Sequence, residues 1–389
     1  MPSLPELPPQ LHTTKNLPPN LLPTLIKTFQ LSSTSFSEIV KTLKPDLLIY
    51  DFFQPWAPKI AFSQNIPSVY FAVSGATLYS FHHHLYTQGT SSNFPYQAIY
   101  LLDHEKSTNV CDRLQPIIKD ADNDFAFGNF TLSSDIILMK SSRGVEGKYI
   151  DYLSVLCNKP VVPTGPLVVH GKNDDEDDDD EEDSEILKWL SEKNHSSTIF
   201  ISFGSEYILS ENQIEEIAKG LELCDANFIW VVRFPIGEVK ISIEDKLPLG
   251  FLDMVKERGM VVSGWAPQTR ILGHSSIGGF VSHCGWSSVM ESMYFGVPII
   301  GMPIKADQPI NARMVVEAGV GVEVGRGKNG NYAGEEIAKA INKVIVEKTF
   351  YEGLRNRAKK LSEKIKEKEE EEVNEAAEQL LRLCMKNKQ

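Results

Sequence analysis

The sequence predicts an α/β fold with two Rossmann-like, doubly wound domains. Short β-branched apolar runs alternate with amphipathic segments, and several of these runs end in glycine-containing turns; this pattern indicates parallel sheets covered by helices. The 389 residues are 42% hydrophobic and 23% charged, enough for two globular cores. We expect an N-terminal domain over residues 1–165, an acidic linker and the start of the second domain over 166–196, and a C-terminal domain over 197–389.

The N-terminal half begins with a proline-rich approach and then alternates strand and helix. Residues 24–43 carry apolar side chains at helical spacing and predict one amphipathic helix. Three apolar runs predict parallel strands: DLLIYD (46–51), IPSVYFA (66–72) and DIILMKSS (135–142). Asp51 therefore ends a strand at the carboxyl edge of a sheet, where open α/β folds bind ligands.

The C-terminal half alternates more regularly. Five strands are predicted: STIFISFGS (197–205), FIWVVRF (228–234), MVVSGW (260–265), GGFVSHCG (278–285) and VPIIGMPI (297–304). A long charged helix from about residue 350 to residue 384 completes the domain. Gly204 and Ser205 occupy the loop after the first of these strands.

The stretch from Trp265 to Gln308 carries the chemistry. The turn at 283–288 places small residues, hydroxyls and an imidazole at a helix N-terminus, whose N–H groups and dipole can hold a phosphate without a metal. Glu291 lies one turn into that helix, where a carboxylate could accept ribose hydroxyls, and Trp265 offers an indole for stacking a base. Asp307 and Gln308 follow the next strand on the same edge, so the stretch outlines a binding site for a sugar nucleotide.

This stretch resembles the signature box of the plant UDP-dependent glycosyltransferases, the family-1 enzymes with the two-domain GT-B fold. It has the family's opening WAPQ, its central HCGW, the following Glu and the closing DQ, at the family's spacing. One position differs, because Ser287 stands where the family generally has Asn.

The resemblance implies a role for each matching residue. Trp265 would stack on uracil, and the Ala266 backbone and Gln268 would contact uracil and ribose. The diphosphate would be held by His283, Ser288 and the amides near Gly285 and Trp286, with Ser287 beside them, and Gly204 and Ser205 would face the phosphates. Glu291 would hold the ribose, and Asp307 and Gln308 would hold the sugar hydroxyls. In the family a closing Gln usually goes with glucose as donor. No metal or other cofactor is implied.

The likeness extends over nearly the whole chain. HTTKNLPPNLLPTL, DLLIYDFFQPWAP, EGKYIDYLSVL and FISFGSEY resemble plant enzymes that glucosylate a sugar already attached to a small molecule. The resemblance implies an inverting, UDP-glucose-dependent glucosyltransferase of plant secondary metabolism, with a flavonoid or terpenoid glycoside as acceptor. Direct transfer to an aglycone is the alternative.

The general base of this family is absent from the sequence. In the family, a histidine in a Gly-His loop after the first N-terminal strand takes the acceptor's proton, and a carboxylate matching Asp51 orients it. Nothing before residue 46 reads as that strand and loop, so we expect an N-terminally truncated domain, lower stability in this half and slow turnover. His12 lies in a proline-flanked loop, and His82, His83 and His84 lie on a predicted helix in the acceptor region rather than in a metal site. A catalytically silent UDP-sugar-binding relative is the second hypothesis.

Composition excludes several other classes. The net charge of −13 argues against nucleic acid or anionic membrane as a partner, and NDDEDDDDEED at 173–183 reads as a solvated linker rather than a calcium site. Five scattered cysteines without a CxxC pair, no signal peptide and no apolar run of about 20 residues indicate a cytoplasmic protein without a membrane span. We expect a monomer. A dinucleotide-dependent oxidoreductase is disfavoured, because no GxGxxG follows a predicted strand.

Overall fold

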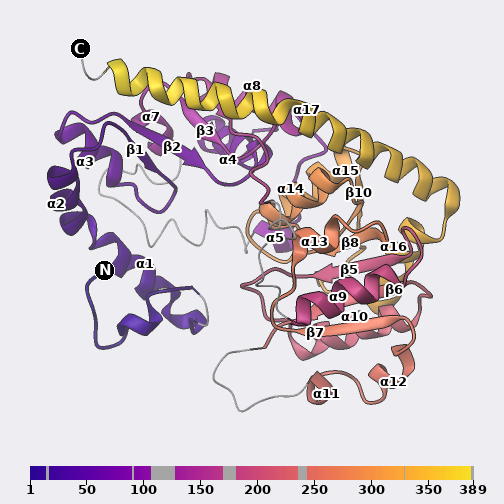
Figure 1. The fold of residues 1–389 in the computed structure, drawn as a ribbon. Helices are drawn as coiled ribbons and strands as arrows, with labels where there is room; N and C mark the ends of the chain where they lie inside the picture. The colour runs from indigo at the N-terminus through magenta and orange to yellow at the C-terminus, as the bar shows by residue number, and fades with distance from the viewer. Residues whose placement is uncertain are drawn as a thin grey trace. The chain divides into compact units, whose positions relative to one another are not determined.

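The computed structural model describes residues 1–14, 17–89, 92–106, 128–169, 181–234, 243–327 and 329–386. The chain divides into two compact units, each built on a parallel sheet (Figure 1). The first unit comprises Met1–Leu167, Lys305–Asp307 and Ile365–Gln389, and the second comprises Val168–Ile304 and Gln308–Lys364. Residues 170–180, which include most of the acidic run in the predicted 166–196 linker, lie outside the described residues.

The sheet of the first unit contains the predicted strands. It has four parallel strands in sequence order: β1 (Leu48–Tyr50), β2 (Ser68–Ala72), β3 (Ile137–Met139) and β4 (Val161–Pro163). Its helical segments are η1 (Pro9–Leu11), η2 (Pro19–Leu21), α1 (Leu22–Gln30), α2 (Ser33–Leu43), α3 (Ala57–Ser63), α4 (Ala76–Gln88), α5 (Asp103–Lys106), α7 (Gly128–Leu132) and α8 (Arg143–Cys157).

The single helix predicted over 24–43 is wrong, because the structure has two helices there. The amides of Leu31 and Ser32 donate to the carbonyls of Thr28 and Phe29, three residues back, at 3.2 and 3.0 Å. Such bonds tighten the end of α1, and the run of serines and threonines that follows competes with helical hydrogen bonding through its side chains. Apolar spacing continues across the break, so the pattern alone did not reveal it.

A buried carboxylate fixes the start of α4. Glu146, fully buried in α8, accepts from the amides of Ala76 and Thr77 at 2.8 Å each, and from the Thr77 and Ser141 hydroxyls at 2.6 Å each. Burial raises the pKa of Glu146, while these hydrogen bonds oppose the increase. A carboxylate at the N-terminus of α4 satisfies amides that helix geometry leaves without a partner.

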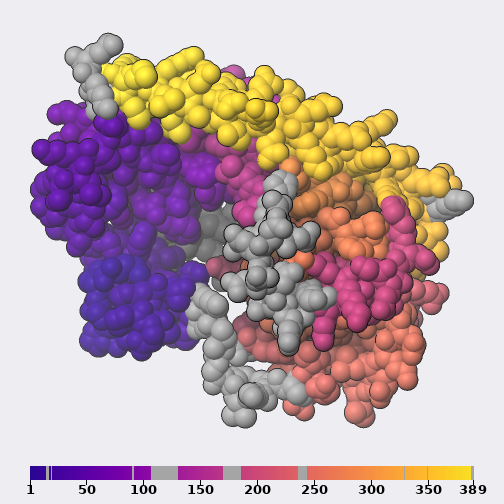
Figure 2. All heavy atoms as spheres, viewed as in Figure 1, coloured from indigo at the N-terminus to yellow at the C-terminus, as the bar shows by residue number. Residues whose placement is uncertain are grey.

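The predicted long C-terminal helix is present as α17 (Lys348–Lys386). From Ile365 onward it belongs to the first unit, where Ala376 and Leu383 pack against Leu138 and Val162 of that sheet. Glu372 accepts from the Arg143 amide at 2.7 Å, so α17 also caps α8. Its opposite face carries charged side chains and is exposed (yellow in Figure 2).

The second unit has six parallel strands in the order β10-β9-β8-β5-β6-β7. Their bounds are β5 (Thr198–Ser202), β6 (Asn227–Val232), β7 (Gly259–Ser263), β8 (Ile277–Ser282), β9 (Ile299–Gly301) and β10 (Gly321–Glu323). The chain starts at central β5, adds β6 and β7 on one side, and then returns to add β8, β9 and β10 on the other. The order therefore reverses between β5 and β8, and in open α/β sheets ligands bind beyond the carboxyl ends of the strands at such a point.

Helices cover this sheet and enclose two apolar clusters. They are α9 (Glu181–Ser191), α10 (Glu211–Glu222), α11 (Ile243–Lys246), α12 (Phe251–Val255), α13 (Gln268–Leu272), α14 (Trp286–Phe295), α15 (Gln308–Glu317), α16 (Gly334–Ile345) and the first part of α17. Alternate β5 residues point to opposite faces: Ile201 packs with α10 and α16, whereas Phe200 packs in the other cluster with Ile186 of α9.

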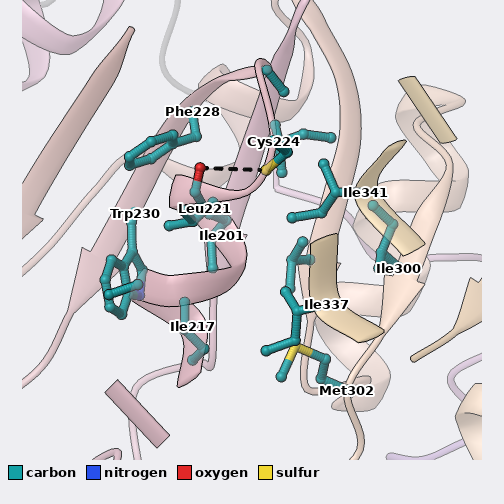
Figure 3. Packing of buried hydrophobic residues seen from close by; sticks show 14 of the residues in the cluster. Ile201, Ile217, Leu221, Cys224, Phe228, Trp230, Ile300, Met302, Ile337 and Ile341 are labelled. Carbon is teal, nitrogen blue, oxygen red and sulfur yellow. Dashed lines mark hydrogen bonds between the residues drawn. The ribbon is translucent and has the colours of Figure 1, made fainter. Parts of the chain in front are cut away.

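The cluster under α10 and α16 shows how a cysteine serves as a core residue (Figure 3). Ile217 and Leu221 of α10 lie beside Ile337 and Ile341 of α16. Cys224 donates from its thiol to the Leu221 carbonyl at 3.5 Å, and burial raises the pKa of this thiol to about 11. Within the described residues the cysteines are free thiols.

Candidate functional site

Two glycine backbones hold the imidazole of His283 at the point where the strand order reverses. His283 follows β8 and Gly204 lies two residues past β5, and Ser202 pairs in register with Ser282. A Cβ atom added to Gly204 would lie 2.9 Å from Cε1 and Nε2 of His283, and one added to Gly285 would lie 2.6 Å from Nε2. The ring therefore needs glycine on both sides. Gly204 also has a φ of +78°, which side-chain-bearing residues rarely adopt.

The turn after His283 is held from α15. Cys284 has a φ of 63° although it is not glycine, and its amide donates to the Ser282 hydroxyl at 3.1 Å. Asn311, fully buried, donates from Nδ2 to the Cys284 carbonyl at 3.0 Å. A left-handed conformation costs a non-glycine residue about 1–2 kcal/mol, so this bond helps to hold the turn in place.

The helix α14 begins directly at this turn. Gly285 is its N-cap residue, with no capping side chain, so the positive end of the helix dipole lies beside His283. Trp286 and Ser288 are buried, whereas Ser287, the position that differs from the family, is exposed. This N-terminus has the geometry of an anion site.

Gln268 joins the predicted base end of the site to α14. Its Nε2 donates to the Glu291 carboxylate at 2.6 Å and to the Ser288 hydroxyl at 3.1 Å. Trp265 and Ala266 lie between β7 and α13, the helix that begins at Gln268. Trp265 is 68% exposed, whereas Ala266 is buried. The structure thus brings together the residues predicted to contact the base and the ribose.

The remaining predicted donor residues follow β5 and β9. Ser205 is exposed in the loop after β5. Gln308 is the first residue of α15 and is buried, with its Oε1 accepting from the Ile304 amide at 2.9 Å. Asp307 directly precedes it, in the short segment that clusters with the first unit.

Asp51 lies in the first unit, directly after β1 as predicted. Its Oδ1 accepts from the Phe53 amide at 2.8 Å, so the carboxylate closes its own turn. Burial raises the pKa of neighbouring Tyr70, and the charge of Asp51 contributes to the increase.

His12, His82, His83 and His84, which the sequence analysis considered, are hydrogen-bonded or buried within the first unit. His12 is bonded to the Leu7 carbonyl at 3.1 Å. His82, His83 and His84 are buried in α4, and both ring nitrogens of His84 are hydrogen-bonded, to the Tyr152 and Ser92 hydroxyls. In the parts of the chain that the structure describes, no histidine is hydrogen-bonded to Asp51 and no cluster of candidate metal ligands occurs.

Two residues at this site were not identified from the sequence. Asn311 reaches the Cys284 turn from α15, and Arg233, after β6, contacts both Gly204 and Trp265. An amide inside an otherwise buried helix was the available signal for Asn311, because such a group needs a partner. No local pattern indicated Arg233.

Comparison with known proteins agrees with this geometry. The profile of the family described as "UDP-glucoronosyl and UDP-glucosyl transferase" matches residues 172–369. The chain is 51% identical to a mogroside IIIx synthase of Siraitia grosvenorii, over 96% of this chain and 82% of that protein. It is 45% identical to the beta-D-glucosyl crocetin beta-1,6-glucosyltransferase of Gardenia jasminoides, over 100% of this chain and 86% of that protein. The chain belongs to the UDP-glycosyltransferases, within the plant family-1 group.

A solved structure gives the same fold. UGT2 of Phytolacca americana, complexed with UDP-2fluoro-glucose and pterostilbene, matches with a TM-score of 0.76 and 28% identity, over 94% of this chain and 82% of that chain. The fold is thus GT-B, as predicted, and the protein is an enzyme that transfers a sugar from a UDP-sugar donor to a small-molecule acceptor. Within the described residues, every helix is too short or too polar to cross a membrane.

Proposed function

We propose that this enzyme transfers glucose from UDP-glucose, with inversion at the anomeric carbon, to a hydroxyl group of a plant glycoside. The observation that carries the proposal is the glycine cradle of His283, formed by Gly204 and Gly285 on either side of its imidazole. It lies at the start of α14, where the strand order of the sheet reverses. In this proposal the first unit binds the acceptor and the second binds the donor.

The donor would lie along the carboxyl edge of the second sheet. Uracil would stack on the exposed indole of Trp265, with the Ala266 backbone beside it, and the ribose would bind Glu291 and Gln268. The diphosphate would bind the N-terminus of α14, together with the following residues: Gly204, Ser205, His283, Gly285, Trp286, Ser287 and Ser288. Asp307 and Gln308 would bind the hydroxyls of the sugar. Because no side chain caps α14, the helix dipole supports a diphosphate there without a metal ion.

The reaction itself needs charge stabilisation and a proton acceptor. The acceptor oxygen bonds to the anomeric carbon as the bond from that carbon to the UDP oxygen breaks, and the acceptor proton leaves to a base. Negative charge then grows on the diphosphate, where the α14 N-terminus and His283 would stabilise it. Asp51 is proposed as the carboxylate of the proton-transfer machinery, because it follows a parallel strand in the acceptor unit.

The acceptor class follows from the relatives. One relative is a glucosyltransferase named for a glucosylated acceptor, beta-D-glucosyl crocetin, and for a β-1,6 linkage. Since 100% of this chain aligns with 86% of that relative at 45% identity, we propose an acceptor that already carries a sugar. The family description includes both glucuronosyl and glucosyl transferases, so the donor must be tested directly.

The test measures release of UDP from UDP-glucose and UDP-glucuronate with flavonoid and terpenoid glycosides and their aglycones. We expect UDP-glucose and the glycosides to give the higher rates. His283→Ala should lose UDP affinity and turnover, whereas His274→Ala should retain both, because His274 lies at the amino end of β8 and contacts Ser276. Asp51→Asn should bind UDP normally but lose turnover; Asp135→Asn, at the amino end of β3, is its control.

Three results would contradict the proposal. Equal UDP affinity in His283→Ala and wild-type protein would place the diphosphate elsewhere. Faster turnover with aglycones would make the acceptor an unglycosylated molecule. UDP binding that depends on His283, with no turnover on any acceptor, would support a donor-binding protein instead.

A further inference from the structure

In the second unit, the residues that follow four neighbouring strands form a row along the carboxyl edge of the sheet. In the order β8, β5, β6 and β7, the strands lead into His283, Gly204, Arg233 and Trp265. Neighbouring strands are about 4.8 Å apart, so this edge spans roughly 14 Å. A nucleoside diphosphate lying along it would direct its base toward β7 and its phosphates toward β5 and β8.

Within this row, Arg233 contacts the residues on both sides of it, Gly204 and Trp265. Its Nε donates to the Gly204 carbonyl at 3.1 Å, and its guanidinium carbon lies 5.7 Å from the centroid of the Trp265 ring. A cation within about 6 Å of an indole centroid is attracted to the ring face. Because Trp265 is 68% exposed, few other contacts restrict its indole, and Arg233 therefore has a large share in orienting it.

The charge of Arg233 is also suited to an anionic ligand. The side chain is half-buried, and burial lowers its pKa, although a guanidinium stays protonated. Within the described ranges, no carboxylate forms a salt bridge with Arg233. Its bond to Gly204 uses one of five N–H donors. A partly desolvated cation costs free energy that a nearby diphosphate would offset.

We propose that Arg233 is a positioning residue for the UDP part of the donor. Its guanidinium holds the Trp265 indole and the Gly204 turn in one arrangement, and its charge stabilises the diphosphate at the same edge. The inference rests on the proposed roles of Trp265 and Gly204 in donor binding. It assigns Arg233 no part in bond breaking, so its effect should be on the binding of the donor.

The experiment compares the affinities of UDP and uridine for the full chain, by calorimetry for UDP and by competition against UDP for uridine. We expect Arg233→Gln to weaken UDP about tenfold and uridine less, because uridine lacks the charged groups. Arg233→Lys should recover part of the UDP affinity, since it retains the charge but not the planar guanidinium. With UDP-glucose, Arg233→Gln should raise KM about tenfold and leave kcat within about twofold.

Arg258 provides a matched control. Its guanidinium lies 5.7 Å from the Phe228 ring centroid and donates to the carbonyls of Leu221 and Ala226, but it precedes β7 at the amino edge of the sheet. Arg258→Gln removes a similar cation–ring contact away from the proposed site. It should lower the melting temperature without changing UDP affinity.

Two results would overturn the inference. One is an Arg233→Gln variant that binds UDP as tightly as the wild type. The other is a loss of UDP affinity no larger than that of Arg258→Gln at matched stability, which would make Arg233 a structural residue. Failure of the proposed function is distinguishable, because Trp265→Ala would then bind UDP normally, or the wild type would not bind UDP.

Discussion

The glycine cradle around His283 allows a prediction in which backbone strain and steric contact are separated. Gly285 has an ordinary φ of −59°, so alanine there introduces a contact without backbone strain. Its Cβ would lie 2.6 Å from Nε2 of His283, and the ring must retreat by about 0.8 Å to reach ordinary contact at 3.4 Å. Gly204 combines both effects, with a φ of +78° and a Cβ position 2.9 Å from the ring.

A third glycine isolates the strain. Gly250 has a φ of +81° and no atom within 4 Å of its Cβ position. Gly250→Ala should therefore lower the free energy of unfolding by about 1–2 kcal/mol and leave UDP binding unchanged. Gly285→Ala should reduce kcat/KM for UDP-glucose about 10- to 100-fold, because a displacement near 1 Å in a positioned group costs up to about 10²-fold. Gly204→Ala should show both losses.

The assay is urea unfolding of each variant, with UDP calorimetry and initial rates on the same preparations. Gly285→Ala with wild-type UDP affinity and turnover would refute the reasoning, because the imidazole would then not need its observed position. A loss of UDP affinity in Gly250→Ala as large as that in Gly204→Ala would show that strain alone affects the site.

Three further predictions follow from buried polar groups. Glu146→Gln should lower the free energy of unfolding in urea by about 2–3 kcal/mol, because charge-assisted bonds to Thr77 and its neighbours are lost; a loss below about 0.5 kcal/mol would contradict this. Asn311→Ala should weaken UDP binding in calorimetry about tenfold, and Cys284→Gly in that background should restore part of it, because glycine adopts the φ of 63° without strain; no rescue would argue against a role through the turn. Burial lowers the pKa of His82 to about 4 in the folded protein, compared with about 6.5 in the unfolded chain. The unfolded state therefore binds the proton first as the pH falls, so the contribution of neutral His82 to the free energy of unfolding is complete above pH 6.5. That free energy should decrease by up to about 3 kcal/mol as the pH approaches 4. His82→Leu should flatten this pH profile of urea unfolding, and an unchanged slope would contradict the assignment.

Local patterns in the sequence were enough to predict most of the helices and strands and most residues of the proposed donor site. Parallel strands buried on both faces read as short apolar runs, and a glycine turn followed by helical spacing locates the N-terminus of α14. The box from Trp265 to Gln308 places its chemistry at fixed intervals in one continuous stretch, so the family could be identified without coordinates. The same patterns did not reveal the break between α1 and α2, because it depends on how one turn is bonded rather than on apolar spacing.

Only the tertiary structure decided which strand ends are neighbours. Gly204 and His283 are far apart in the chain, and their contact exists because β5 and β8 pair in register at the centre of the sheet. The amide of Asn311 and the guanidinium of Arg233 reach the site in the same way, from elements whose own spacing carries no record of their partners. Strand pairing joins segments distant in sequence, and local periodicity records only the face that each segment buries.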